Sequence, residues 1–271
     1  MKKLFCIISF IALSFASASF AQDVAVVYDA KMENGDGLGI EGGAAGAKGL
    51  ADMIVEKLND EKLNAEIVDA DGLVEYMEAN QNGIFILTQG NTPDTIFQNK
   101  GKDDLIYSWL RDGGIGGSIG DYPLYYYWDF DANNRVTVEG AGQQKIFGFT
   151  VTNANTAAVA PTDLGEEYMP SLGKWTSNRP VGLNVLKNNN FEFESYADNG
   201  NDADPIAYRT DDMEGWFINF HTSCCGTVIP GNEQVATEYA ELIANRFAPE
   251  AQAVDPTGKV SVVWGKLKSL R

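Results

Sequence analysis

The sequence contains few of the residues on which conventional catalytic and metal sites depend. Its 271 residues include one histidine, His221, and three cysteines. Cys6 lies near the N-terminus, whereas Cys224 and Cys225 are adjacent. Adjacent cysteines cannot link distant segments, so three alternatives remain for them: buried thiols, a disulfide between the two, or a bond between chains. A zinc or copper site built from His221 and both cysteines would still need another ligand.

Basic residues are also scarce, because 20 lysines and arginines stand against 38 acidic residues, a net charge of −18. Nucleic acids and anionic membrane surfaces attract basic patches. We therefore expect neither of them as a partner. An acidic surface is instead compatible with cation binding and with good solubility.

The N-terminal segment, residues 1–21, has the pattern of a secretory signal. Lys2 and Lys3 precede a short apolar run, and small residues follow, with cleavage expected after Ala18 or Ala21. The run is too short to span a bilayer comfortably. Loss of two lysines and no acids would change the net charge from −18 to −20. The sequence therefore predicts a secreted or periplasmic protein.

Short apolar runs alternate with segments of helical spacing along the mature chain, which predicts an α/β fold with a mostly parallel sheet. The predicted strands are 24–28, 65–69, 83–88, 116–123 and 216–220. Apolar residues recur at helical spacing in three segments: from Leu50 to Leu58, from Leu105 to Leu110 before Gly113, and over 232–247. One domain, 22–250, accounts for this alternation, and we expect the tail 251–271 to pack back onto it.

The middle of the domain, about 130–200, differs from this alternation. Strand-like segments there are separated by Asn, Gly and Pro, and they cover 135–140, 145–151, 181–186 and 191–196. We interpret this part as an inserted or elaborated β region within the same domain.

Ligands of open parallel sheets bind beyond the carboxyl ends of the strands. The loops that follow the predicted strands carry polar side chains to that edge. These side chains are Asp29, Gln89, Asn91, Asp121, Tyr122 and His221. The topology therefore predicts a ligand site at this edge.

Three segments resemble the class I glutamine amidotransferase-like superfamily, in particular its trehalose-utilisation-type and glycosidase-associated members. They are NGIFILTQGNTPD (82–94), LRDGGIGGSIGDYPLYYYW (110–128) and GWFINFHTS (215–223). The resemblance implies a flavodoxin-like three-layer sandwich. It also places His221 at the position of the family's catalytic histidine.

The rest of the family's Cys-His-Glu triad is missing from these segments. The nucleophile turn reads Ser118-Ile119-Gly120-Asp121, and Ser223 stands where the glutamate is expected. A histidine needs a nucleophile to activate and a carboxylate to orient it, so glutaminase chemistry is not expected. The sequence favours a non-catalytic binding or structural protein. The alternative is a hydrolase rebuilt on His221 and Asp121, either by themselves or together with Cys224 or Cys225.

The segment after Asp121, YPLYYYWDFD, is rich in aromatic residues. Tyr122, Tyr125, Tyr126 and Trp128 offer broad apolar faces that would stack on sugar rings. We therefore predict a glycan or other small-molecule ligand there, held also by Gln89 and Asn91. The alternative for the aromatic residues is that they fill the core, and for Asp121 that it caps a turn.

Oxygen-bearing residues alternate directly after the aromatic segment. Asp129, Asp131 and Asn133 resemble the start of a calcium loop, but the bidentate glutamate that closes an EF-hand is missing. Calcium is therefore the one candidate cofactor, and a polar turn is the alternative interpretation.

Overall fold

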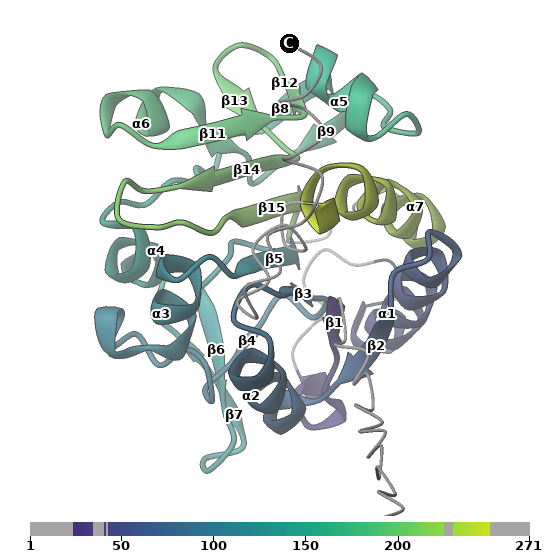
Figure 1. The fold of residues 1–271 in the computed structure, drawn as a ribbon. Coiled ribbons are helices and arrows are strands. Elements are labelled where there is room, and N and C mark those ends of the chain that lie inside the picture. The colour runs from purple at the N-terminus through teal and green to yellow at the C-terminus, as the bar shows by residue number, and fades with distance from the viewer. Residues whose placement is uncertain (1–23, 35–40, 42, 225–229, 250–271) are drawn as a thin grey trace, which may run out of the picture.

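The computed structural model describes residues 24–34, 41, 43–224 and 230–249 (Figure 1). The predictions for the signal segment 1–21, the tail 251–271 and Cys225 lie outside the described residues. No helix in the described part is long and apolar enough to cross a membrane.

A seven-stranded sheet forms the centre of the fold, in the order β11-β14-β15-β5-β3-β1-β2. The strands are β1 (Val24–Val27), β2 (Ala65–Val68), β3 (Ile84–Leu87), β5 (Ile115–Gly120), β11 (Glu192–Ser195), β14 (Ile206–Arg209) and β15 (Phe217–Thr222). The run from β15 to β2 is parallel throughout, and β14 is antiparallel to both of its neighbours, β15 and β11. This confirms the predicted α/β class with a mostly parallel sheet.

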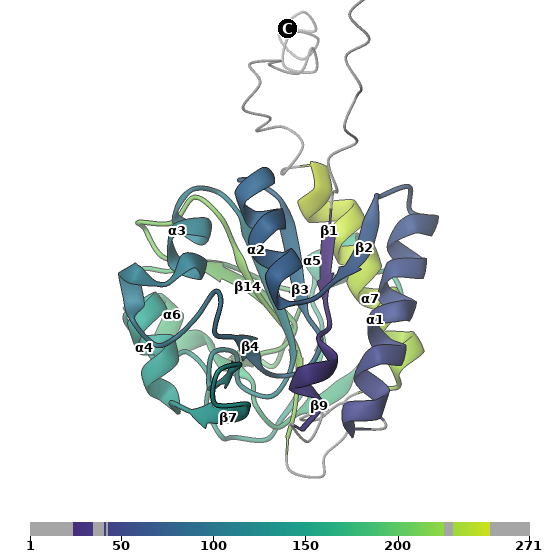
Figure 2. The same ribbon diagram turned by 90° about the horizontal axis from the view of Figure 1, so that it is seen from below.

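Helices cover both faces of the sheet, as parallel β-α-β connections require. Figure 2 shows α1 (Gly43–Asp60) and α7 (Asn232–Leu242) on one side, and α2 (Ala70–Ala79) and α3 (Leu105–Arg111) on the other. A π-helical turn, Ile243–Phe247, extends α7. Apolar residues at helical spacing bury one face of each helix, so the sheet separates two hydrophobic cores.

The middle region contains the predicted β structure together with three helices, α4 (Gly140–Phe147), α5 (Asp163–Tyr168) and α6 (Leu183–Asn188). Two small sheets complete it. One contains β10 (Val181–Gly182), β13 (Asp202–Ala203), β12 (Ala197–Asp198), β8 (Ala157–Pro161) and β9 (Trp175–Ser177). The other joins β7 (Asn134–Thr137) of this region to two strands that precede it, β4 (Thr92–Pro93) and β6 (Tyr126–Asp129). Outside the middle region, short 3-10 turns occupy Ala30–Asn34 and Gly101–Asp103.

Two strand predictions in this region were wrong. Within 145–151, Ile146 and Phe147 instead face the core from the end of α4, which stops at Gly148 with a left-handed φ of 81°. Within 181–186, only the first two residues pair as a strand before α6 begins. Short runs of apolar residues fit either period, so packing against the rest of the fold decided between helix and strand.

The parallel strands end at one edge of the sheet, which we name the carboxyl edge. In Figure 2, β1 runs toward the edge at which β4, β7 and β9 also lie. The elaborated region therefore brings its own side chains to the place where the strand-end loops gather.

Candidate functional site

His221 occupies a β-bulge near the end of β15. The register between β15 and β5 shifts between Phe220 and Thr222, and His221 has a φ of 47°. Bulges re-aim side chains, and a left-handed non-glycine residue is uncommon. The imidazole is 1% exposed, with its ring 4.6 Å from Trp175 and 4.7 Å from Phe220 between centroids. The bulge therefore directs His221 into the interior instead of toward a ligand.

A carboxylate on α7 holds the imidazole in place. Nε2 of His221 lies 2.5 Å from Oε2 of Glu238, whose Oε1 accepts hydrogen bonds from Gln234 Nε2 at 2.8 Å and from the Gly173 amide at 3.3 Å. Nδ1 of His221 is buried without a hydrogen-bond partner. The histidine thus has an orienting carboxylate, but among the described side chains no nucleophile bonds to it.

Asp204 is a second buried acid close to His221. Its Oδ2 accepts hydrogen bonds from Ser177 Oγ at 2.7 Å, from the Thr222 amide at 2.8 Å and from Thr222 Oγ1 at 2.7 Å. Burial raises the pKa of Asp204 to about 6, and the charge of His221 opposes that rise. We name Asp204, His221 and Glu238 the buried cluster. It joins β15 to β9 and to α7.

Cys224 is disulfide-bonded, so the free-thiol alternative is wrong for this residue. The bonded sulfur accepts a short hydrogen bond from Nη2 of Arg179. A sulfur in a disulfide is not a thiolate and cannot serve as a nucleophile. In the alternative hydrolase site, Cys224 therefore cannot be the nucleophile in this structure.

Asp121 follows Gly120 at the end of β5 and is buried. Its Oδ1 accepts hydrogen bonds from the Tyr122 amide at 2.8 Å and from Nε of Arg179 at 3.3 Å. Burial raises the pKa of Asp121, and the Tyr122 amide and Arg179 partly offset that rise. Asp121 is engaged by its own turn and by a guanidinium, and no contact found among the described residues joins it to His221.

Three tyrosines beside Asp121 form a continuous row with an arginine at each end. We name this the edge row, and its members in order are Arg179, Tyr122, Tyr125, Tyr126 and Arg135. Arg179 lies 4.6 Å from the ring centroid of Tyr122, and Tyr122 stacks on Tyr125 with centroids 5.3 Å apart. The rings of Tyr125 and Tyr126 meet edge to face at 4.6 Å, and Arg135 lies 4.6 Å from the Tyr126 centroid. A cation thus flanks each end of three tyrosines.

Several polar groups of this row have no partner within the described part of the protein. Arg135 Nη1 is buried without a hydrogen bond. The side-chain hydroxyls of the three tyrosines have no hydrogen-bond partner among the described residues. Asn91 is 2% exposed, and neither its Oδ1 nor its Nδ2 has a partner. Because Thr92 pairs with Tyr127, the β4–β6 register places Asn91 beside Tyr126. Buried groups without partners thus occur beside the row, as they do in the buried cluster, where Oδ1 of Asp204 and Nδ1 of His221 also have none.

Three predicted ligand residues belong to the interior instead. Gln89 is buried and braces a loop, because its Oε1 accepts from the Asp29 amide at 2.8 Å and its Nε2 donates to the Asp29 carbonyl at 3.0 Å. Trp128 belongs to β6, and it is 1% exposed, so its side chain is buried in the interior. Neither side chain offers a surface to a ligand, and the same holds for Asn91, which is 2% exposed, so the candidate site retains Tyr122, Tyr125 and Tyr126.

The predicted calcium loop is a polar turn in this structure. Oδ1 of Asp129 accepts a hydrogen bond from the Ala132 amide at 2.8 Å, while Asp131 and Asn133 are exposed. In the described ranges, no group of three or more His, Cys, Asp or Glu side chains could hold a metal ion. These contacts lend no support to a calcium site.

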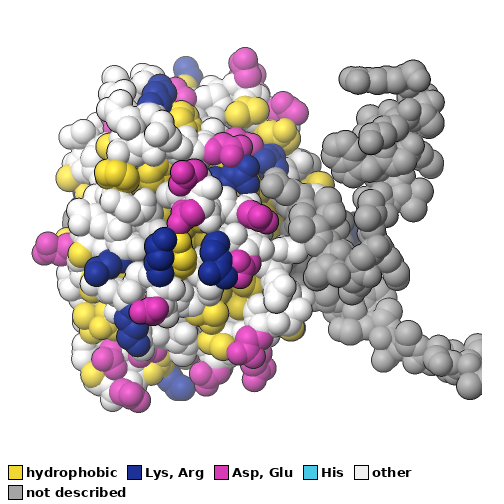
Figure 3. All heavy atoms as spheres, turned by 60° about the vertical axis from the view of Figure 1, so that its left-hand side comes forward, with side chains coloured by type: hydrophobic (Ala, Val, Ile, Leu, Met, Phe, Trp, Pro, Cys, Tyr) yellow, Lys and Arg dark blue, Asp and Glu magenta, His cyan; other side chains and the backbone are white. Residues whose placement is uncertain are grey.

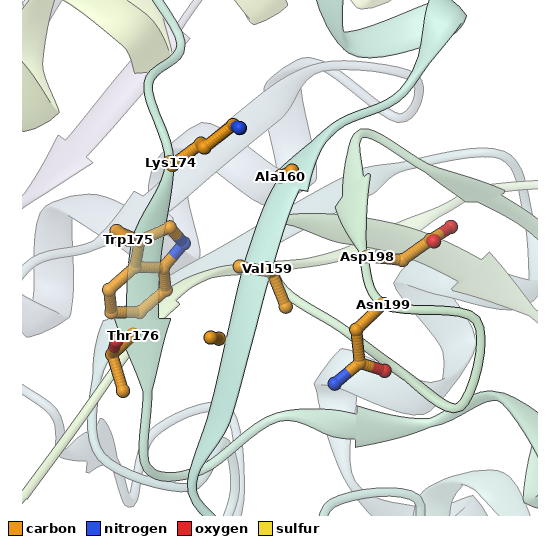
Figure 4. A pocket seen from close by; sticks show the side chains of 8 residues that line it. Val159, Ala160, Lys174, Trp175, Thr176, Asp198 and Asn199 are labelled. Atoms are coloured by element: carbon orange, nitrogen blue, oxygen red, sulfur yellow. The ribbon is translucent and has the colours of Figure 1, made fainter.

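A shallow cavity of about 440 Å³ lies elsewhere, over β8 and β9 (Figure 4). It is lined by Ala158, Val159, Ala160, Lys174, Trp175, Thr176, Asp198 and Asn199. The Asp198 carboxylate already accepts from Ser195 Oγ at 2.9 Å and from the Gly200 amide at 3.0 Å. The edge row combines more unsatisfied polar groups with the position expected for a ligand, so we prefer it as the candidate site.

Comparison with known proteins adds little to this geometry. No family model and no curated protein matches the chain. Among solved structures, the chain is similar to the exo-β-1,4-mannosidase Op5Man5 from Opitutaceae bacterium strain TAV5, with 13% identity and a TM-score of 0.36. The match covers 86% of this chain and 35% of the mannosidase chain. A similarity this low carries no argument about fold or function.

Proposed function

We propose that the chain is an exported, non-catalytic binding protein that holds a carbohydrate at the edge row. The order β2-β1-β3-β5-β15 of the parallel strands is that of flavodoxin-like sheets, whose ligands bind beyond the carboxyl ends. This order supports the flavodoxin-like part of the proposal, and with it the amidotransferase-like ancestry implied by the sequence resemblance.

The unpartnered polar groups of the edge row carry the proposal. Saccharides present many hydroxyls that both donate and accept hydrogen bonds. The hydroxyls of Tyr122, Tyr125 and Tyr126 are complementary to such a ligand. The ring faces are covered by guanidinium groups and by one another, so recognition would use ring edges and hydroxyls more than the stacking expected from the sequence.

The non-catalytic part of the proposal follows from the bonds that the candidate catalytic groups already make within the protein. His221 is buried and bonded to Glu238, Asp121 is bonded to Arg179, and Cys224 is in a disulfide. A hydrolase rebuilt on His221 and Asp121 would need these groups to share one substrate. Their separate engagements make that alternative the weaker one.

Isothermal titration with cellohexaose, β-1,4-mannohexaose and a galacturonate hexasaccharide tests the proposal. We expect at least one of them to bind. Tyr125→Phe should then weaken binding about fivefold, because one hydrogen bond contributes roughly 1 kcal/mol. Tyr168→Phe on α5 removes a tyrosine hydroxyl outside the row and should leave the affinity unchanged. Failure of all three saccharides to bind, or equal effects of the two substitutions, would contradict the proposal.

A further inference from the structure

We propose that the carbohydrate held at the edge row is anionic, with a carboxylate of the uronate type bound by Arg135. This inference rests on the proposed function and specifies its ligand class.

Arg135 differs from the other arginines of the described ranges. Four of them pair with a carboxylate: Arg111 with Asp112, Arg179 with Asp121, Arg209 with Glu192 and Arg246 with Glu194. No ion pair or hydrogen bond of the Arg135 side chain is found there, although acidic residues outnumber basic ones almost two to one. Figure 3 shows the usual arrangement on one face, where lysines and arginines lie among acidic side chains.

The Arg135 guanidinium is held in an orientation that suits an incoming carboxylate. Its position over the Tyr126 ring, 4.6 Å from the centroid, restrains the plane of the group. Nη1 is buried without a partner, and an unsatisfied buried donor is costly. An incoming carboxylate cannot reach the buried Nη1, but Nε and Nη2 are not buried, and it could accept two parallel hydrogen bonds from that edge, the arrangement that distinguishes arginine from lysine.

The charges facing Arg135 leave it available to an anion. The charge of Arg135 acts on Asp121, but the carboxylate of Asp121 is hydrogen-bonded to Arg179 at the other end of the row. The charge of Arg179 is thereby balanced, and that of Arg135 is not. In a chain with a net charge of −18, a local unpaired cation selects where an anionic ligand can settle.

The saccharide part of the ligand would meet the neutral groups of the row. The hydroxyl of Tyr126 lies on the ring that Arg135 covers, and the register places Asn91 beside Tyr126. A uronate carries its carboxylate on the same ring as its hydroxyls. Arg135 and Tyr126 can therefore contact one sugar residue together, while the amide of Asn91 stays buried beneath them.

Matched pairs of oligosaccharides test the charge requirement. The first pair is the galacturonate hexasaccharide and its fully methyl-esterified form. The second is β-1,4-mannuronate hexasaccharide and β-1,4-mannohexaose. We expect the acidic member of at least one pair to bind about ten or more times more tightly than its neutral partner, with a difference that shrinks as salt is added. Sodium acetate at equal carboxylate concentration should not bind measurably, since it lacks the sugar hydroxyls.

Substitution of Arg135 assigns the effect to its guanidinium. Arg135→Gln should reduce the affinity for the acid to that for its neutral partner, and Arg135→Lys should restore only part of it. Arg111→Gln is the matched control, because Arg111 is exposed and paired with Asp112. The melting temperature of each variant reports whether it has folded.

Three outcomes overturn the inference. Equal binding of acidic and neutral members, sensitive to Tyr125→Phe but not to Arg135→Gln, removes the anionic ligand and leaves the proposed function in place. Binding of acetate as tight as that of the acidic hexasaccharides removes the saccharide from the inference. Absence of binding to every oligosaccharide removes both the inference and the proposed function.

Discussion

The edge row and the buried cluster both lie near the ends of central strands, but their side chains differ in burial and in how many hydrogen bonds they make within the fold. In the buried cluster, His221 bonds to Glu238, and one oxygen of Asp204 accepts three hydrogen bonds. Oδ1 of Asp204 and Nδ1 of His221 have no partner, but both residues are buried, whereas the tyrosines of the edge row are only partly buried and no hydrogen bond of their hydroxyls is found in the described part of the protein. A position near the ligand edge is thus insufficient to identify a site, because groups already bonded within the fold are not available to a ligand.

This difference predicts that the two regions respond differently to substitution. Removing a group from the buried cluster leaves a buried charge or donor unpaired, so the free energy of unfolding should fall. Removing a group from the edge row takes away an interaction that only a ligand completes, so affinity should fall while stability changes little.

The largest expected effect on stability is that of Glu238→Ala. It leaves His221, Gln234 and the Gly173 amide without the carboxylate to which they are bonded, and losing the partner of buried groups should cost about 3 kcal/mol. Urea unfolding followed by circular dichroism measures the loss. Glu233→Ala, an exposed substitution on the same helix, should cost less than about 1 kcal/mol. Similar losses in the two variants would show that the His221–Glu238 pair does not hold α7 to the sheet.

A smaller effect, dependent on pH, is expected from Asp204→Asn. The pKa of Asp204 is about 6 in the folded protein against 3.8 as its ordinary value, so the folded state binds the proton more tightly than the unfolded state. Its contribution to stability is therefore greatest below about pH 4 and is lost as the pH rises toward 6. The amide of the variant cannot ionise, so the fall in unfolding free energy between about pH 4 and pH 7 should be roughly 2 kcal/mol smaller than in the original protein.

Urea unfolding at several pH values across this range measures the difference directly. Subtracting the profile of the variant from that of the original protein removes the contributions of the other titrating groups. Parallel profiles would mean that Asp204 has the same proton affinity in the folded and unfolded states.

Much of the central sheet could be predicted from the sequence. The runs that became β1, β2, β3 and β15 are short, apolar and separated by helical spacing, so local pattern and tertiary packing agree. In the middle region, local pattern and tertiary packing disagree in two places. The segments around Ile146 and Leu186 resemble strands in sequence but form helices, because both residues pack inward there.

From the sequence, only the location of the site at the carboxyl edge and the residues that follow the central strands could be predicted. Asp121, Asn91 and the tyrosines follow β5 or β3 directly, so topology places them at the carboxyl edge. Arg179 and Arg135 reach the same place through the elaborated region, and nothing in their local sequence marks that placement.

The buried cluster carried one signal that the sequence analysis missed. Glu238 lies on the apolar stripe of α7, between Val235 and Leu242, where an acid is unexpected unless it has a buried partner. Asp204 gave no such signal, because an Asp-Pro pair in a polar segment is typical of an exposed turn.

The most direct test of the central claim is an NMR titration with the galacturonate hexasaccharide. The protein would carry labelled histidine and tyrosine rings. The chain has a single histidine, so the His221 signal needs no assignment, and Tyr125→Phe identifies one signal of the edge row. We expect the Tyr125 ring signal to shift on titration while the His221 signal stays in place. A shift of His221 with no change at Tyr125 would contradict the account, because it would place the ligand at the buried cluster.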